Sequence, residues 1–301
     1  SGTLTDPYTL CTCQELQDVT DLNAHYKLID SIRCYQSMNE GKGFIPLGNA
    51  TNPFTGTLDF NYKYLYYLHI DQQNRTGVGI FSHARNADIK NLRVSSTNWI
   101  VRGNNSVGLF VGHGENITFS NIYQPYYWDN PKKVYANGTD AGAFIGSGKD
   151  IKFFDSNMYV NVTSKGVSGG FAGAVESINI TEGYIIGSVN GTTHAGGLVG
   201  YADNVRLEKS SAQTKTTGSI AGGLLGEAQD AILYQTYAVR DVIGTSVAGG
   251  LIGKVDIVNM THSYSATTPM APIKGVLFGQ INAIEYNTSY WDQTEAMYDM
   301  S

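Results

Sequence analysis

Charged residues are scarce in this chain of 301 residues, since Asp, Glu, Lys and Arg make up only 15% of it, roughly ten points below an average globular domain. A coiled coil needs many more charged residues, so that class is excluded. Long apolar runs are also missing, because no stretch approaches the roughly 18 to 20 residues of a membrane span. The chain does not open with a basic and then apolar leader, so we expect a mature soluble protein whose leader has been removed.

Basic residues are few and dispersed. The 20 Lys and Arg residues are outnumbered by 26 Asp and Glu residues, which gives a formal net charge of −6, and they form no stripe along the chain. Proteins that bind phosphate backbones carry such a stripe, so nucleic acid is not an expected partner. Disorder is excluded as well, because a disordered chain carries fewer aromatic residues than the 11 Phe, 3 Trp and 20 Tyr found here.

Glycine, by contrast, is abundant, with 35 residues. Many of them open or close a five-residue motif, Gly-x-x-x-Gly, with an incomplete first copy at Gly79. The full copies begin at Gly108, Gly142, Gly169, Gly196, Gly222, Gly249 and Gly275. The eight starts are separated by 29, 34, 27, 27, 26, 27 and 26 residues, and a period this regular predicts a repeat architecture.

Each repeat carries a strand pattern after the last glycine of its motif, which we call the closing glycine. The fifth and seventh residues after it are apolar and the sixth is mostly polar, an alternation typical of a strand with one buried face. The apolar pairs are Ile117 and Phe119, Ile151 and Phe153, Ile178 and Ile180, Val205 and Leu207, Ala231 and Leu233, Val258 and Met260, and Ile284 and Tyr286.

A column of small residues stands at the tenth place after the closing glycine: Ser156, Gly183, Ser210, Thr236, Ser263 and Ser289. Small residues at this interval suit a tight corner, where stacked hydroxyls hydrogen-bond to the backbone. A repeat of about 26 residues cannot bury its apolar face alone, so the pattern predicts an all-β fold, a parallel β-solenoid of about eight coils. We expect the motif glycines at its corners, where they allow positive φ and close contact with the next coil.

The first 75 residues differ from the repeats. The spacing of Leu16 and Val19 predicts a short helix over Gln14–Asp21 with Thr12 or Cys13 as its N-cap, followed by a strand-like run, Tyr26–Ile29. The predicted organisation is an N-terminal cap with the first coils over residues 1–75, repeats over 76–292 and a tail over 293–301. The cap covers the core of the first coil.

The repeats resemble the GLUG motif of surface and adhesin-like proteins and of the non-catalytic N-terminal region of some IgA-cleaving peptidases. The resemblance rests on Ala195–Gly200, Ala221–Gly226 and Ala248–Gly253, on an opening block that includes Cys13–Gln17, Tyr26–Asp30, Phe44–Gly48 and Phe54–Asp59, and on Tyr290–Asp292 at the end. It departs at Leu58–Asn61, where the family commonly has Asp-Gly-Asn-Gly. The family implies a right-handed β-helix used as an extracellular stalk and no catalytic residues.

The three cysteines lie in the cap. A disulfide between Cys13 and Cys34 is one interpretation, and Cys13 is favoured over Cys11 because it stands at the position matched to the family. Three reduced, buried cysteines are the alternative. A zinc site is weaker, because no fourth ligand is spaced near them and His25 and His69 are isolated.

Glycosylation is the sharpest signal of function. The acceptor triplet Asn-X-Ser/Thr occurs at Asn49, Asn74, Asn104, Asn116, Asn137, Asn161, Asn179, Asn190, Asn259 and Asn287, ten of the 23 asparagines. The Ser and Thr content predicts fewer than half as many by chance, so we expect N-linked glycans and passage through a secretory pathway. Some triplets are also explained by the composition of a β-solenoid rich in Asn, Ser and Thr.

Catalytic constellations were sought and none is predicted. Asp150, Asp203 and Asp230 recur three or four residues after a closing glycine, where a turn-capping role explains them. The six histidines share no metal spacing, and no nucleophile elbow surrounds a serine. We therefore expect no catalytic residues, no metal and no cofactor.

Aromatic side chains are the remaining chemistry. Tyr62, Tyr64, Tyr66 and Tyr67 crowd one strand region, and candidate contact aromatics lie in the insertion that lengthens one repeat: Tyr123, Tyr126, Tyr127 and Trp128. The leading hypothesis is a secreted, non-catalytic structural or adhesive glycoprotein, a rigid glycan-coated module that self-assembles or binds another surface protein or glycan. The alternative is a protein that binds or cleaves polysaccharide along one face of the solenoid, and a third interpretation makes the chain a fragment of a longer surface protein.

Overall fold

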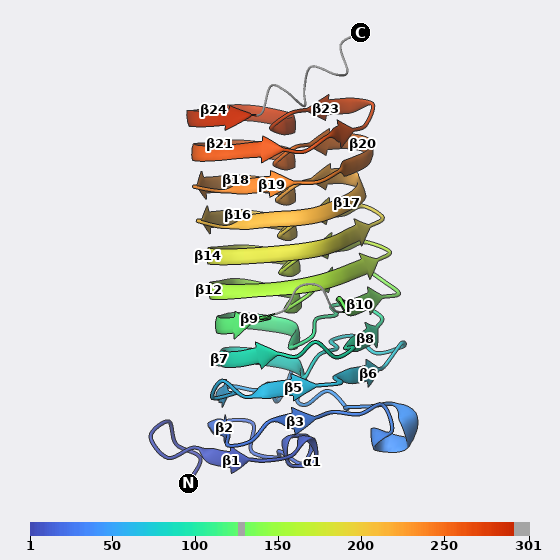
Figure 1. Ribbon diagram of the computed structural model, residues 1–301, viewed down its shortest axis with the longest axis vertical. Coiled ribbons are helices and arrows are strands. Elements are labelled where there is room, and N and C mark those ends of the chain that lie inside the picture. The colour runs from blue at the N-terminus through green and yellow to red at the C-terminus, as the bar shows by residue number, and fades with distance from the viewer. Residues whose placement is uncertain (126–129, 292–301) are drawn as a thin grey trace.

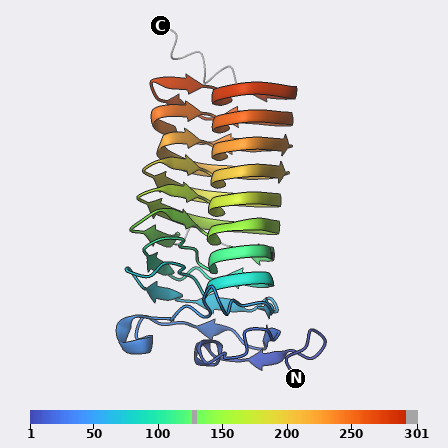
Figure 2. The ribbon, with the colours of Figure 1, turned by 180° about the vertical axis from the view of Figure 1, so that it is seen from behind.

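The structure, a computed structural model, describes residues 1–125 and 130–291, with side chains described through residue 284. The chain climbs from the N-terminus in about eight stacked coils (Figures 1 and 2), and all pairings between its strands are parallel. In Figure 1 the front strands run from left to right as the chain rises, which makes the solenoid right-handed. The predicted fold class, a right-handed parallel β-helix with a short helix in its cap, is confirmed.

The N-terminal cap contains short elements. They are β1 (Tyr8–Leu10), α1 (Cys13–Gln17), β2 (Tyr26–Leu28), β3 (Ile32–Arg33), the 3-10 turn η1 (Met38–Gly41), β4 (Thr57–Asp59), β5 (Tyr64–Tyr66) and β6 (His69–Asp71). Thr12 is the N-cap of α1 and forms a capping box with Glu15. The helix ends at Gln17, earlier than predicted, since the β-branched Val19 and Thr20 that follow favour helix weakly.

The repeat region begins with β7 and ends with β24. Its strands are β7 (Phe81–Val94), β8 (Ile100–Gly103), β9 (Val111–Tyr123), β10 (Lys132–Ala136), β11 (Asp140–Gly142), β12 (Ile145–Ser164), β13 (Val167–Gly169), β14 (Ala172–Gly191), β15 (His194–Gly196), β16 (Val199–Glu208), β17 (Ser211–Gly222), β18 (Leu225–Tyr234), β19 (Tyr237–Val239), β20 (Val242–Gly249), β21 (Ile252–Ala266), β22 (Pro269–Met270), β23 (Ile273–Gly275) and β24 (Phe278–Trp291). Equivalent residues of successive repeats are register partners, as Ile151, Ile178 and Val205 show.

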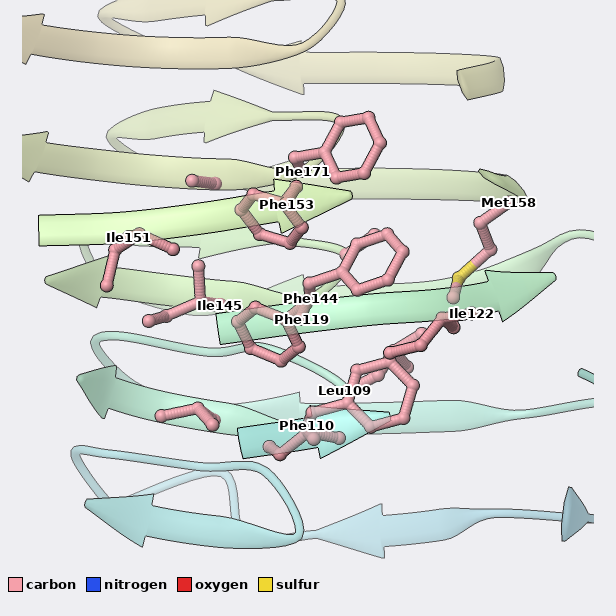
Figure 3. Close-up of a cluster of buried hydrophobic side chains, with 14 of the residues drawn as sticks. Leu109, Phe110, Phe119, Ile122, Phe144, Ile145, Ile151, Phe153, Met158 and Phe171 are labelled. Atoms are coloured by element: carbon pink, nitrogen blue, oxygen red, sulfur yellow. The ribbon is translucent and has the colours of Figure 1, made fainter. Parts of the chain in front are cut away.

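The core follows the predicted alternation. The apolar pairs from Ile117 to Met260 are at most 4% exposed. Phe119 stacks on Phe153 and Phe144 on Phe171, with ring centroids 4.8 and 4.9 Å apart (Figure 3). Ile284 is an exception and is 46% exposed, because the described chain places no further coil over the last one and the register shifts beside its partner Val258.

The corner after each long strand combines two columns. The ninth residue after the closing glycine has a left-handed backbone, with φ between 41° and 57°, at Asn121, Asp155, Glu182, Lys209, Gln235 and His262. The tenth residue is buried, and at three serines its hydroxyl accepts a backbone hydrogen bond from the coil below: Ser156 Oγ from the Ile122 N–H at 3.4 Å, Ser210 Oγ from the Gly183 N–H at 3.0 Å, and Ser263 Oγ from the Thr236 N–H at 3.1 Å. The predicted corner with stacked hydroxyls is confirmed.

The motif glycines serve close packing instead of positive φ, which corrects part of the prediction. None of those from Gly108 to Gly279 has a positive φ. A Cβ on Gly197 would lie 2.0 Å from the carbonyl oxygen of Gly223, and one on Gly223 would lie 2.1 Å from that of Gly250. The neighbouring coil leaves no room for a side chain, while the left-handed corner falls on the larger residues nine places later.

Candidate functional site

The acceptor asparagines lie on the outer surface of the coils. Asn49, Asn74, Asn116, Asn137 and Asn179 are exposed, and Asn104, Asn161, Asn190 and Asn259 are half-buried. None of these nine is buried, and the side chain of Asn287 lies outside the described residues. Asn179 stands between the buried Ile178 and Ile180, so strand alternation directs its amide outward, and Asn259 occupies the same place three coils later.

Local hydrogen bonds distinguish these asparagines. Asn49 Oδ1 accepts from the N–H and the hydroxyl of Thr51, the third residue of its triplet. In this Asx turn the side-chain amide nitrogen of Asn49, the atom that would carry a glycan, takes no part in these two hydrogen bonds. Asn116 instead donates its Nδ2 to Asn86 Oδ1 at 2.9 Å, and Asn161 Oδ1 accepts from the Ser188 hydroxyl at 2.9 Å.

The long insertion holds the predicted contact aromatics. Tyr123 is 45% exposed, whereas Tyr126, Tyr127 and Trp128 lie outside the described residues. Both flanks of the insertion are anchored in the core. Gln124 is buried and its Oε1 accepts from the Tyr159 N–H, and the buried Lys132 donates its Nζ to the Thr97 carbonyl at 2.9 Å.

A tyrosine patch covers the first coils, and we define it by Tyr35, Tyr64, Tyr66 and Tyr67 with Arg33 and Arg93. Tyr35 stacks on Tyr67 with centroids 5.3 Å apart, and both rings are more than 40% exposed. Arg33 lies 5.0 Å from the ring centroid of Tyr66. The predicted crowding of tyrosines is therefore a surface, to which β3 and the segment after it add Arg33 and Tyr35.

A second aromatic array escaped the sequence analysis. Tyr184, Tyr237 and Tyr264 all stand at the eleventh place after a closing glycine, and Tyr237 stacks on Tyr264 with centroids 5.1 Å apart. Burial, with a further contribution from Tyr237, raises the pKa of Tyr184 to about 12. The repeat period carried this signal, but polar residues stand at the equivalent place in the repeats on either side of Tyr184, at Asn157 and Ser211.

The cap contains the disulfide Cys13–Cys34, with Cα atoms 5.3 Å apart, and Cys11 is a free, exposed thiol. This confirms the pairing that the family resemblance favoured. Both bonded cysteines are buried, at 3% and 0% exposure, so the crosslink ties the start of α1 to the segment after β3 inside the core.

The acidic residues weighed as catalytic candidates lie on separate coils. Asp150 has a left-handed φ of 55°, which suits a turn position. Asp203 Oδ1 accepts from the Tyr201 hydroxyl and from Gln229 Nε2, both at 3.0 Å, so this side chain bridges to the next coil. Among the described residues, no three His, Cys, Asp or Glu side chains are grouped so that they could hold a metal ion.

Two histidines that the sequence analysis treated separately are neighbours. His83 on β7 and His113 on β9 are register partners, with ring centroids 5.7 Å apart. They line a cleft of about 310 Å³ together with Gly77, Ser106 and the ion pair of Arg85 and Glu115. Burial, with smaller contributions from His113 and Arg75, lowers the pKa of His83. Counting from Gly79 puts His83 at the last place of the incomplete first motif, whereas His113 follows the closing Gly112, so the alignment of the glycines did not pair the two rings.

Fold and surface define a class: a β-helix repeat protein with a polar, tyrosine-rich exterior. In the described part of the chain, no helix has the length and apolar character to cross a membrane. No protein-family model matches the chain, so membership of the GLUG family stays a prediction.

The chain is similar to Halomucin of Haloquadratum walsbyi (strain DSM 16790 / HBSQ001), at 36% identity over 131 residues. The match covers 40% of this chain and 1% of Halomucin, so it spans a very small part of that relative. Among solved structures, a putative immunoglobulin A1 protease from Bacteroides ovatus aligns over 97% of this chain and 78% of its own, at 14% identity and a TM-score of 0.34. A likeness at that level supports no conclusion about function.

Proposed function

We propose that this chain is a non-catalytic extracellular structural or adhesive glycoprotein, a rigid β-helical module coated with N-linked glycans. The observation that carries the proposal is the placement of the acceptor asparagines. All nine with described side chains are exposed or half-buried, although the chain buries a continuous core beside them. A surface location also accords with the disulfide, since such crosslinks persist in oxidising compartments.

The match to Halomucin supports the same class of function. The name describes that relative as a mucin, and mucin-like stalks are glycosylated extracellular segments. Because the match spans 1% of Halomucin, the role of the whole relative is transferred here only as part of the proposal.

Glycopeptide mass spectrometry on protein purified from its native source tests the proposal. We expect glycan on the exposed set first, namely Asn49, Asn74, Asn116, Asn137 and Asn179. Matched controls are surface asparagines outside any triplet, such as Asn204, which should carry none. Unmodified peptides at every acceptor site would refute the glycoprotein hypothesis.

Self-assembly into a fibre is part of the proposal. Within residues 1–125 and 130–291, β24 pairs with β21 and with no strand on its other edge. Ile273, in the same coil, is 46% exposed. We infer that a second copy of the chain adds its first coil to this edge, because strand edges with unpaired backbone groups are templates for pairing with another chain.

Electron microscopy and sedimentation at increasing protein concentration test assembly. We expect end-to-end particles that lengthen with concentration, and a loss of assembly in Ile273→Lys, since a charge beside the edge opposes pairing. The matched control is Ile232→Lys, which places the same charge on an exposed side of a middle coil. Monomers at every concentration would refute assembly and leave the glycan result standing.

Polysaccharide binding is the second candidate, and the tyrosine patch is the observation that favours it. Tyrosine rings flanked by Arg33 and Arg93 suit stacking against sugar rings, with the guanidinium groups available to acidic sugars. A glycan array combined with a reducing-sugar assay distinguishes the candidates. Binding that Tyr35→Ala abolishes and Tyr8→Ala spares would support the patch, and sugar release would indicate an enzyme.

A further inference from the structure

We propose that His83 and His113 form a binding site for a late first-row divalent cation, with Cu²⁺ preferred over Zn²⁺. The site uses two imidazoles from neighbouring coils and leaves the remaining coordination positions open to water or to an oxygen ligand from outside. The proposal goes beyond the structural and adhesive function and does not depend on it.

The parallel register brings the two rings together. His83 and His113 face each other across adjacent strands, and their centroids are 5.7 Å apart. With metal–nitrogen bonds of about 2.1 Å, two imidazoles on one ion have centroids about 5.3 Å apart at the tetrahedral angle and about 4.5 Å apart at the 90° angle of tetragonal Cu²⁺. The observed separation exceeds both values, so side-chain rotations that bring the rings together complete the site.

Serine hydroxyls hold the other nitrogen of each ring. Ser82 Oγ lies 3.1 Å from His83 Nδ1, and Ser147 Oγ lies 2.9 Å from His113 Nδ1. Such partners on the second nitrogen orient metal-binding histidines. The engaged Nδ1 atoms leave Nε2 of each ring as the nitrogen for a ligand.

The hydroxyl chain also sets the tautomer of His113. Ser147 Oγ donates its proton to Ser106 Oγ at 2.8 Å, so its bond with His113 requires the proton on Nδ1 of the ring. His113 Nε2 then carries a lone pair, the form that binds a metal and not the form that donates to an anion. This favours a cation as the ligand of the cleft.

The cleft leaves room at the rings. Gly77 passes beside His83 with φ of 72°, and a Cβ there would lie 2.8 Å from Ser82 Oγ and 3.1 Å from the His83 ring. Charge does not oppose a cation strongly, because Arg85 is paired with Glu115 at 2.8 Å. Two further charged groups interact with the rings, the positive Arg75 with His83 and the negative Asp140 with His113. Their effects on a bound cation therefore have opposite signs.

The choice of metal follows from the ligand set. Imidazole nitrogens suit Cu²⁺, Zn²⁺ and Ni²⁺, and affinity at such sites rises to Cu²⁺ and falls to Zn²⁺. Ca²⁺ and Mg²⁺ require oxygen ligands and should not compete. The described residues group no third His, Cys, Asp or Glu there, so the site holds its ion by two protein ligands.

Titration of the full folded chain with CuCl₂, followed by calorimetry and electron paramagnetic resonance, tests the site. The chain must lack a polyhistidine tag and carry Cys11→Ser, because the free exposed thiol binds and reduces copper. We expect one equivalent of Cu²⁺ with nitrogen hyperfine coupling, weaker binding of ZnCl₂, and none of CaCl₂.

Variants separate the site from general histidine binding. His83→Ala and His113→Ala should each weaken Cu²⁺ binding at least tenfold, and Ser147→Ala, which removes a positioning residue, by about tenfold. His194→Ala is the matched control, because this histidine already bonds Glu227 through Nε2, and it should bind copper normally. Circular dichroism checks that each variant folds. Unchanged affinity in the His83→Ala/His113→Ala double variant, or a spectrum without nitrogen coupling, would overturn the proposal.

Discussion

The smallest unit that stabilises the cap is the bond between Cys13 and Cys34. It closes a loop with a sequence separation of 21 residues, which contributes about 3 kcal/mol in the chain-entropy description. We expect Cys13→Ser/Cys34→Ser to lower the free energy of unfolding of the cap by about that amount, measured by urea denaturation. Cys11→Ser is the matched control, since Cys11 is exposed and unbonded, and a similar loss in that variant would contradict the assignment.

Asp140 is a single residue whose ionisation opposes folding. Burial raises the pKa of its carboxyl above the ordinary value of 3.8, although a hydrogen bond from Thr139 partly offsets the effect. The folded chain therefore holds this proton more tightly than the unfolded chain, and stability is lost as pH rises from 3.8 through the raised pKa.

Asp140→Asn should accordingly raise the melting temperature at pH 7, and the gain should vanish below pH 3.8. Thermal unfolding of both proteins from pH 3 to 8 measures the difference, and comparing the two cancels the titration of the other carboxyls. Asp150→Asn, a change at an exposed carboxyl, is the control. A gain at acid pH that disappears at neutral pH would show the sign to be wrong.

Residue chemistry also explains which site features the sequence could reveal. The acceptor triplets are defined by covalent chemistry, so all ten were found without a structure, and alternation alone placed Asn179 outward. The tyrosine patch was found only in part, because Arg33 and Tyr35 lie in a separate segment that the first coil folds beside Tyr66 and Tyr67. Nothing in the local sequence specifies that pairing.

At the scale of elements, the hydroxyl column at the corners is the feature with a measurable energy. Ser263 Oγ accepts from the Thr236 N–H and hydroxyl and donates to the Thr261 carbonyl, and the side chain is 1% exposed. Ser263→Ala leaves a buried N–H without this acceptor, which costs about 1–3 kcal/mol.

Chemical denaturation of Ser263→Ala measures that cost. Ser246→Ala is the matched control, because Ser246 is exposed and its hydroxyl accepts a hydrogen bond from the hydroxyl of Ser219 on the neighbouring coil. We expect the control to stay within a few tenths of a kcal/mol of the wild type. Equal midpoints for the two variants would mean that the column does not stabilise the corner.

The sequence predicted the strands and corners correctly where two columns of the repeat agreed, namely the apolar pairs and the small residues after them. The strands were predicted from apolar pairs that the structure buries, and the corner from the small residues after them. The left-handed position was missed because Glu182, Lys209, Gln235 and His262 occupy it, and such side chains do not mark positive φ locally. The hydrogen bonds of the adjacent coils hold the backbone there, which a single repeat cannot signal.

For the whole molecule, the low content of charged residues and the acceptor asparagines both bear on how the surface of the rod is hydrated. With 15% charged residues, the rod presents Asn, Ser, Thr and Tyr to water beside its charged side chains, along with exposed apolar side chains such as Phe154 and Ile232. Net charge ordinarily keeps proteins apart. The chain carries a net charge of −6, and on the proposed function glycans on the outer face add to the separation that this charge provides.

Removing acceptor sites should therefore lower solubility without lowering stability. The variant Asn74→Gln/Asn137→Gln/Asn179→Gln changes three exposed sites. Asn49 is kept because its Oδ1 accepts the bonds of an Asx turn, and Asn116 because its φ of 53° suits Asn better than Gln. Replacement is preferable to enzymatic release by an amidase, which would convert Asn to Asp and add charge. When both proteins are made in a host that performs N-glycosylation, we expect the variant to have the melting temperature of the wild type and a lower limiting concentration in precipitation assays.

The control is the same pair of proteins made in a host without N-glycosylation, where we expect the variant and the wild type to be equally soluble. A variant as soluble as the wild type in the glycosylating host would show that its polar side chains alone hydrate the rod.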